Sequence, residues 1–116
     1  MHNFKELVVW QRAMDLAVNI YQTLLVFPPE EKYGLCNQMK RASISIPSNI
    51  SEGAGRATNT QFKYFLEIAM GSSNELQSQI ELSRRLNFMT DEDSEKLSNE
   101  ALEIYKMILG LYNKLK

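Results

Sequence analysis

Apolar residues recur every three or four positions along almost the whole of this 116-residue chain. That spacing keeps apolar side chains on one side of an α-helix, whereas a half-buried strand would need alternation with a period of two. No stretch alternates with period two for long enough to form a strand. Four apolar stripes are present, and they cover residues 10–27, 35–53, 62–86 and 97–115.

The signals between the stripes predict helices joined by short connections. Pro28 and Pro29 end the first stripe, because proline cannot continue the hydrogen-bond ladder of a helix. Thr58 or Asn59 can cap the third helix, and Thr90 can cap the fourth, which begins with three acids. The predicted fold class is therefore all-α, an antiparallel up-down-up-down four-helix bundle.

Length, charge and cysteine content limit the kind of protein further. A chain of this length supports one core, so residues 1–116 form a single domain. The net charge of −1 argues against the strong positive field of a typical nucleic-acid binder. No signal peptide or membrane-spanning apolar run is present, and the single Cys36 agrees with a reducing compartment, so we expect a cytoplasmic protein without a membrane partner.

The segment SIPSNISEGAGR, residues 45–56, combines helical spacing with residues that favour turns. Pro47 removes one backbone hydrogen bond and crowds the carbonyl four residues earlier. The second helix therefore either kinks near Pro47 or breaks at Ile46. We favour the kink, because Ala42, Ile46 and Asn49 keep one stripe across it.

Asn49 occupies a stripe position that calls for an apolar residue. A buried amide needs hydrogen-bond partners, and the Trp10 indole or the backbone opened by Pro47 could supply them. We expect a small polar network at the end of the bundle that carries the termini, with Glu52 capping or pairing close by.

GAGRAT, residues 53–58, does not fit a dinucleotide-binding loop, because no strand precedes it. We expect the second helix to end here at a glycine in the left-handed conformation, at Gly53 or Gly55. The alternative is an anion site formed by Arg56 and the N–H groups at the start of the third helix.

Catalytic and metal chemistry lack the residues that they need. His2 is the only histidine, which argues against di-iron, zinc and Ser-His-Asp sites. Glu67, Glu75 and Glu81 are expected to be solvated or ion-paired. We therefore predict no catalytic residue, no metal, no cofactor and no small-molecule substrate.

Gly71 lies inside the predicted third helix, where glycine costs about 1 kcal/mol relative to alanine. A close approach by a neighbouring helix, such as the one carrying Ala42, would explain it.

The first and fourth predicted helices carry apolar residues outside the stripe that faces the core. The fourth helix ends ALEIYKMILGLYNKLK, with apolar residues almost all the way round, and the first helix adds Leu7, Val8, Val9, Leu25 and Val26. A monomer should not expose so much apolar surface. We therefore expect a homo-oligomer built through these helices.

Four segments, in this order, resemble the bacterial 23S rRNA intervening-sequence proteins: FKELVVWQRAMDLAVNIYQ, FPPEEKYGL, QMKRASISIPSNISEGAGR and FLEIAMGSSNELQSQIE. The resemblance implies a four-helix bundle that assembles into a ring-shaped homopentamer. A related protein is the accessory subunit of diversity-generating retroelements, which binds nucleic acid and a reverse transcriptase. No catalytic residue is established for the family.

The resemblance also suggests roles for individual residues. It implies structural or assembly roles at the bundle end for Trp10, Asn49, Glu52, Gly53 and Gly55, and we add Pro47 as the site of the kink. The candidate phosphate-binding residues are Lys40, Arg41 and Arg56.

Two functions remain open. The first is a non-enzymatic oligomeric adaptor that binds structured RNA or a nucleic-acid-processing protein. The second is a purely structural homo-oligomer that scaffolds another enzyme, such as a reverse transcriptase, without affinity for nucleic acid.

Overall fold

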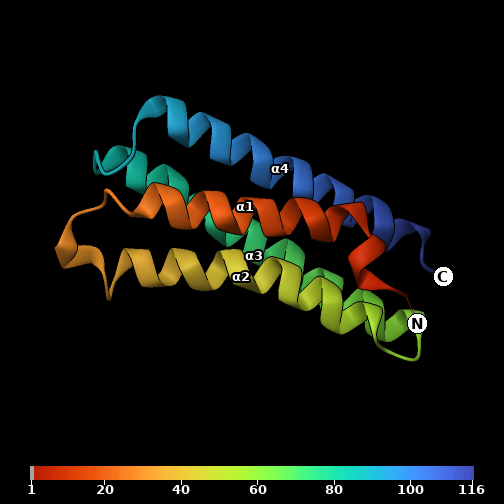
Figure 1. The fold of residues 1–116 in the computed structure, drawn as a ribbon. Helices are drawn as coiled ribbons and strands as arrows, with labels where there is room; N and C mark the ends of the chain where they lie inside the picture. Colours follow the sequence, from red (N-terminus) through yellow and green to blue (C-terminus); the bar gives the residue numbers. More distant parts are fainter. Residues whose placement is uncertain (1) are drawn as a thin grey trace.

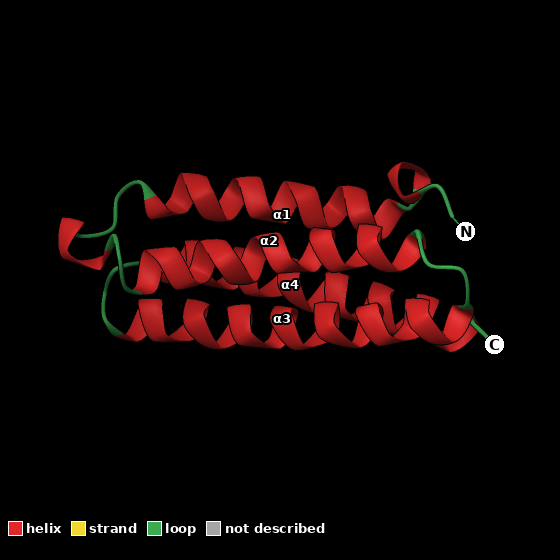
Figure 2. Ribbon diagram, turned by 90° about the horizontal axis from the view of Figure 1, so that it is seen from below, coloured by secondary structure: helices red, strands yellow, loops and turns green. Residues whose placement is uncertain are grey.

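The computed structural model describes residues 2–116, and these residues form four long α-helices without any strand. The helices are α1 (Val8–Leu24), α2 (Leu35–Ala54), α3 (Asn59–Arg85) and α4 (Asp91–Lys114), with two short 3₁₀ helices, η1 (Phe4–Glu6) and η2 (Pro29–Glu31). Figure 2 shows that the rest of the described chain consists of short loops and turns. The all-α prediction and its four helices are confirmed.

Successive helices run in opposite directions, as in the predicted up-down-up-down bundle (Figure 1). The N-terminus, the C-terminus and the α2–α3 turn lie at one end, which we call the terminal end. The α1–α2 and α3–α4 turns lie at the opposite end, which we call the turn end. Each helix packs against its neighbours in the order α1, α2, α3, α4 and back to α1.

The core consists of the predicted inward stripes of all four helices. Fully buried side chains include Leu16, Ile46, Phe62, Leu76 and Ile104. The burial follows the three-and-four spacing because a helix repeats every 3.6 residues.

Helix α2 continues without interruption through Pro47, so the predicted break at Ile46 does not occur. Pro47 is itself buried and supplies no N–H, so the Ser43 carbonyl has no i+4 amide donor. Beside it, the Ser43 hydroxyl donates to the Lys40 carbonyl at 2.9 Å. The segment is one long helix that tolerates a proline.

Gly53 brings α2 and α3 into close contact near the terminal end. A Cβ atom at this position would lie 2.8 Å from Phe65 Cβ, 2.9 Å from Phe62 Cδ1 and 3.2 Å from the Phe62 carbonyl oxygen. A side chain at Gly53 would therefore occupy the space of α3. This explains why an apolar stripe contains a glycine at this point.

The prediction of a left-handed glycine at the end of α2 is wrong. Helix α2 ends at Ala54, and Gly55 has φ −84°, a right-handed conformation. Its amide donates to carbonyls in the last turn of the helix, so the helix tightens into a right-handed turn at this end.

The predicted caps of α3 and α4 are confirmed. Thr58 Oγ1 accepts from the Gln61 amide at 3.2 Å, and Thr90 Oγ1 accepts from the Asp93 amide at 3.1 Å. Each hydroxyl satisfies one of the N–H groups that the start of a helix leaves unpaired.

Helix α3 ends in a hydrogen-bonded turn that the sequence reading did not predict. Asn87 has φ +61°, and the amides of Asn87 and Phe88 donate to the carbonyls of Arg84 and Ser83 at 3.0 and 2.9 Å. This is the Schellman arrangement, with asparagine in the place that glycine usually takes. The turn directs Phe88 back onto Phe27, with 5.7 Å between the ring centroids.

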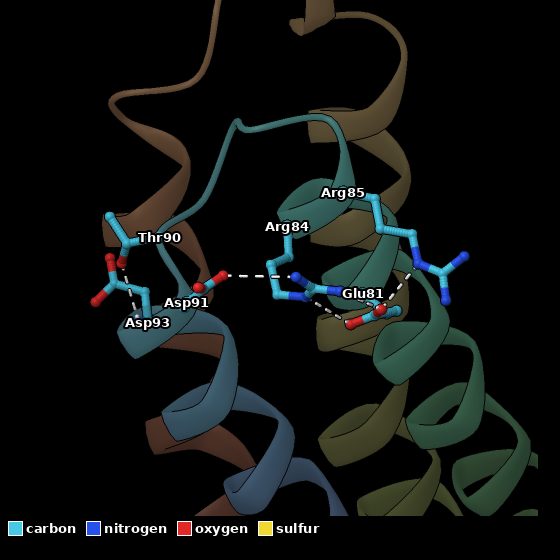
Figure 3. A network of polar contacts seen from close by, with 6 residues as sticks. All are labelled: Glu81, Arg84, Arg85, Thr90, Asp91 and Asp93. Carbon is cyan, nitrogen blue, oxygen red and sulfur yellow. Dashed lines mark hydrogen bonds and ion pairs between the residues drawn. The ribbon is translucent and has the colours of Figure 1, made fainter.

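Charged side chains connect the end of α3 to the start of α4 (Figure 3). Glu81 accepts hydrogen bonds from Arg84 at 2.8 Å and from Arg85 at 2.9 Å, and Arg84 also reaches Asp91 at 3.5 Å. The hydrogen bonds from Arg84 and then Arg85 lower the pKa of the Glu81 carboxyl to about 2. Glu81 is thus an ion-paired surface residue, as predicted, and it stays ionised at neutral pH.

Candidate functional site

A groove of about 580 Å³ runs between α1 and α2 on the surface of the bundle. Helical spacing places one row of α1 side chains along it, because residues three or four apart lie on the same face. The residues that form most of its walls are Trp10, Met14, Val18 and Tyr21 from α1, with Ile44 and Pro47 from α2. The lining is almost entirely apolar.

The Phe4 and Trp10 rings form the part of the groove nearest the terminal end. They meet edge to face, with 5.1 Å between their centroids. Phe4 belongs to η1, whose N-cap Asn3 accepts from the Lys5 amide at 3.3 Å. The 3₁₀ turn therefore places a second aromatic ring beside Trp10.

Exposed apolar side chains continue past the groove toward the turn end. Leu25 and Val26 are 83% and 81% exposed, and Val18 within the groove is 52% exposed. Tyr21 lines both this groove and a smaller hollow of about 260 Å³ next to the α1–α2 turn. The apolar surface is therefore continuous along α1, and a fold with its own complete core does not need it.

Helix α4 contributes less to this surface than the sequence suggests. Ile104 and Ile108 are buried, and Met107, Leu111 and Tyr112 are half-buried against the core. We predicted extra apolar residues on the surfaces of both α1 and α4. Those of α4 are mostly buried within the bundle, whereas those of α1 remain exposed.

Asn49 lies in a polar network, but neither predicted partner is part of it. Its Nδ2 atom donates to the Ser45 carbonyl at 2.8 Å and lies 3.0 Å from the Ser45 hydroxyl, which pairs with the Ser72 hydroxyl of α3 at 2.8 Å. The carbonyl freed by Pro47 belongs to Ser43, two residues away. The Asn49 network therefore links α2 to α3 and does not reach Trp10.

The three candidate phosphate-binding residues do not form one patch. Lys40 Nζ lies 5.0 Å from the centre of the Tyr21 ring, at the edge of the groove. Arg56 forms an ion pair with Glu52 and lies 4.7 Å above the Phe65 ring. Arg41 lies thirteen residues before the end of α2, about 20 Å along the helix axis from the turn that carries Arg56.

The other expected polar residues pair locally. Glu52 pairs locally with Arg56 and is not part of the Asn49 network. Glu67 accepts from the Tyr112 hydroxyl at 2.7 Å, a bond that raises the pKa of Tyr112, and Glu75 accepts from Gln79 at 3.3 Å. Arg12 pairs with Glu103 across α1 and α4, which raises the pKa of Arg12 and lowers that of Glu103.

Residues 2–116 contain no group of three or more histidine, cysteine, aspartate or glutamate side chains placed to hold a metal ion. Cys36 is buried, and the loss of hydration raises the pKa of its thiol. Within the same residues, no helix combines the length and the apolar character that crossing a membrane requires.

The sequence analysis did not identify four of the groove residues as site residues: Met14, Val18, Tyr21 and Ile44. A signal for them exists in the sequence, because Met14, Val18, Tyr21 and Leu25 form a second row beside the core stripe of α1. That row could equally have been buried under a neighbouring helix. Only the positions of α1 and α2 show that it faces outward.

Comparison with known proteins agrees with the fold. A solved structure of a protein with unknown function from the S23 ribosomal protein family of Bacteroides thetaiotaomicron is 27% identical to this chain, with a TM-score of 0.83. The alignment covers 92% of this chain and 100% of that one. None of the curated proteins compared with this chain matches it.

A family model described as 23S rRNA-intervening sequence protein matches residues 5–110. That range begins within η1 and ends within α4, and it includes the Asn49 network and all the groove residues except Phe4. The chain therefore belongs to the 23S rRNA-intervening sequence protein family.

Proposed function

We propose that this protein is a non-enzymatic adaptor that works as a homo-oligomer, with the α1–α2 groove as the contact surface between copies. The observation that carries the proposal is the continuous apolar surface along α1, from Trp10 to Val26, on a bundle whose core is already complete. Water contact with such a surface is unfavourable, and a second protein removes it.

Two further points support an adaptor. Neither the family description nor the structural relative carries a named activity, and four of the five arginines among the described residues pair with acidic side chains at the surface. The family resemblance adds the number of copies, which is five in a ring. We therefore propose a ring of five copies.

Val18→Glu is expected to convert the protein from a pentamer to a single copy. The substitution places a charge in the middle of the groove, where burial against a second copy would leave it unpaired. In the free bundle Val18 faces solvent, so the helical content and folding should be retained. Light scattering after size-exclusion chromatography should give about five times the 13.4 kDa mass of the chain for the unmodified protein and one chain mass for the variant.

Asn99→Glu is the matched control, because it adds the same charge at an exposed position on α4. Its mass should equal that of the unmodified protein. A single-chain mass for the unmodified protein across the micromolar range would contradict the proposal.

A second candidate function is binding of structured RNA through Lys40 and Arg41. Arg41 is exposed and is the one arginine without an ion pair among residues 2–116; Arg12, Arg56, Arg84 and Arg85 all have acidic partners. The family description, which concerns an insertion in 23S rRNA, is consistent with such a ligand.

The double substitution Lys40→Glu and Arg41→Glu is expected to lower the affinity for RNA. It should also make that affinity less sensitive to salt concentration. Loss of two phosphate contacts should reduce the slope of log affinity against log salt by about 1.4 to 1.8. Filter binding at several salt concentrations measures this slope. Lys96→Glu with Lys106→Glu, on the exposed side of α4, controls for the change in net charge. Retention that is the same with and without these charges would favour a scaffold that does not bind nucleic acid.

A further inference from the structure

The α1–α2 groove and the smaller hollow beside it differ in charge. None of the described residues that line the groove is charged. Tyr21 lines both the groove and the hollow next to the α1–α2 turn, so the two adjoin at this residue. Among the described residues that line the hollow, the charged ones are Lys32 and Lys40. A long apolar surface therefore ends at two positive charges.

The ammonium groups of these two lysines have no acidic partner within the described chain. Lys40 Nζ lies 5.0 Å from the centre of the Tyr21 ring, and Lys32 Nζ lies 5.3 Å from the centre of the Tyr33 ring. Neither lysine forms an ion pair with any of residues 2–116. Because an ammonium group carries three N–H donors, contact with a ring face leaves donors for an anion.

No negative charge balances the lysines inside the hollow, as far as the described residues show. Glu31 of η2 accepts from the Leu35 amide at 3.4 Å and does not line the hollow. Cys36 lines the hollow, but burial raises the pKa of its thiol, so the thiol stays neutral at neutral pH. The hollow therefore favours an anionic group.

The groove has the length and volume of a site for one acyl chain. From Tyr21 to Trp10 it follows eleven residues of α1, which span about 16 Å along the helix axis. This is the length of the extended tail of myristate, a saturated fatty acid. The groove volume of about 580 Å³ lies within the range of about 300–1,000 Å³ that is usual for small-molecule sites.

We infer that the groove and the hollow together bind a single-chain anionic amphiphile, of which a fatty acid is the simplest. The acyl tail lies along the groove between Trp10 and Tyr21, where its burial removes apolar surface from water. The carboxylate lies in the hollow and accepts charge-assisted hydrogen bonds from Lys40 and Lys32.

This binding needs only one chain, so the inference goes beyond the proposed function. The two nevertheless share the groove, because the tail would cover the surface that we propose as the contact between copies. The amphiphile and a second copy therefore compete, and binding of the amphiphile should release single copies from the assembly.

Titration of the lipid-free, full-length chain with myristate, below the concentration at which it forms micelles, tests the inference. Trp10 is the only tryptophan of the chain and lines the groove, so its fluorescence reports directly on the tail. A saturable change in emission is expected. Laurate, which is two methylene groups shorter, should bind up to about 15-fold more weakly. No saturable change with myristate would overturn the inference.

The double substitution Lys32→Gln and Lys40→Gln tests the position of the carboxylate. It should lower the affinity for myristate by about tenfold or more, because the charge-assisted hydrogen bonds are lost. The affinity for tetradecanol, which has the same tail and no charge, should not change. Lys96→Gln with Lys106→Gln is the matched control on the exposed side of α4 and should bind myristate normally. Equal losses for the acid and the alcohol would overturn the inference.

Val18→Glu tests the position of the tail, because it places a negative charge in the middle of the groove. The variant should bind myristate at least about tenfold more weakly, whereas Asn99→Glu on α4 should bind it normally. Circular dichroism confirms that both variants are folded. Unchanged binding by Val18→Glu would show that the ligand lies outside the groove and would overturn the inference.

The mass in solution separates this inference from the proposed function. A multiple-chain mass without any binding of myristate overturns the inference and leaves the homo-oligomer standing. Binding by a protein that has a single-chain mass from the start supports the inference and contradicts the homo-oligomer. Binding that leaves a multiple-chain mass unchanged supports the binding site and contradicts the groove as the contact between copies.

Discussion

Phe62→Ala is expected to lower the free energy of unfolding by about 3–5 kcal/mol. Phe62 is 1% exposed, lies directly under Gly53 and contacts the His2 ring at 5.1 Å between centroids. Truncation removes its apolar contacts and leaves a cavity that the packed α2–α3 interface cannot close. Urea denaturation followed by circular dichroism measures the loss.

Tyr33→Ala is the matched aromatic truncation on the surface. Tyr33 is 84% exposed, so its loss should change stability by about 0.5 kcal/mol or less. All variants are compared at one protein concentration, because assembly contributes to apparent stability. Equal effects of the two truncations would contradict the placement of Phe62 in the core.

Gly53→Ala is expected to destabilise the protein by about 1–3 kcal/mol, although alanine favours helices. The added methyl group would lie under 3 Å from two phenylalanine side-chain atoms and 3.2 Å from a backbone oxygen, so α2 and α3 must move apart. The midpoint of urea denaturation should fall accordingly. The effect arises from the contact between two helices and not from the glycine's backbone freedom.

Gly110→Ala separates these two causes. Gly110 is also inside a helix, but a Cβ atom there has open space, so alanine should stabilise the protein by about 1 kcal/mol or less. A stabilising effect of alanine at both positions would disprove the close approach at Gly53.

The helices could be predicted from the sequence because their causes are local. An apolar stripe with three-and-four spacing, a proline stop after the first helix, and hydroxyl caps at Thr58 and Thr90 each act within a few residues along the chain. The inward faces followed from the same spacing. The absence of a break at Pro47 followed from the continuous stripe on both sides of it.

Predictions that depended on how helices meet succeeded less often. The role of Gly55 was assigned from a common helix ending, yet the chain leaves α2 in a right-handed conformation. Asn49 was expected to bond to the Trp10 indole or to the backbone opened by Pro47, and it donates to Ser45 instead. The approach expected at Gly71 is absent, whereas the one at Gly53 was not foreseen.

For the candidate site too, the local features could be predicted from the sequence, whereas the arrangement of the helices could not. The sequence contains the apolar row of α1 and the basic pair at 40–41, but it does not determine whether a row faces a neighbouring helix or solvent. That depends on the distance between α1 and α2 and on their rotation, which the packing of all four helices sets together. Local spacing therefore determined the four helices and their buried sides, and the tertiary structure alone decided which of the remaining sides form a groove.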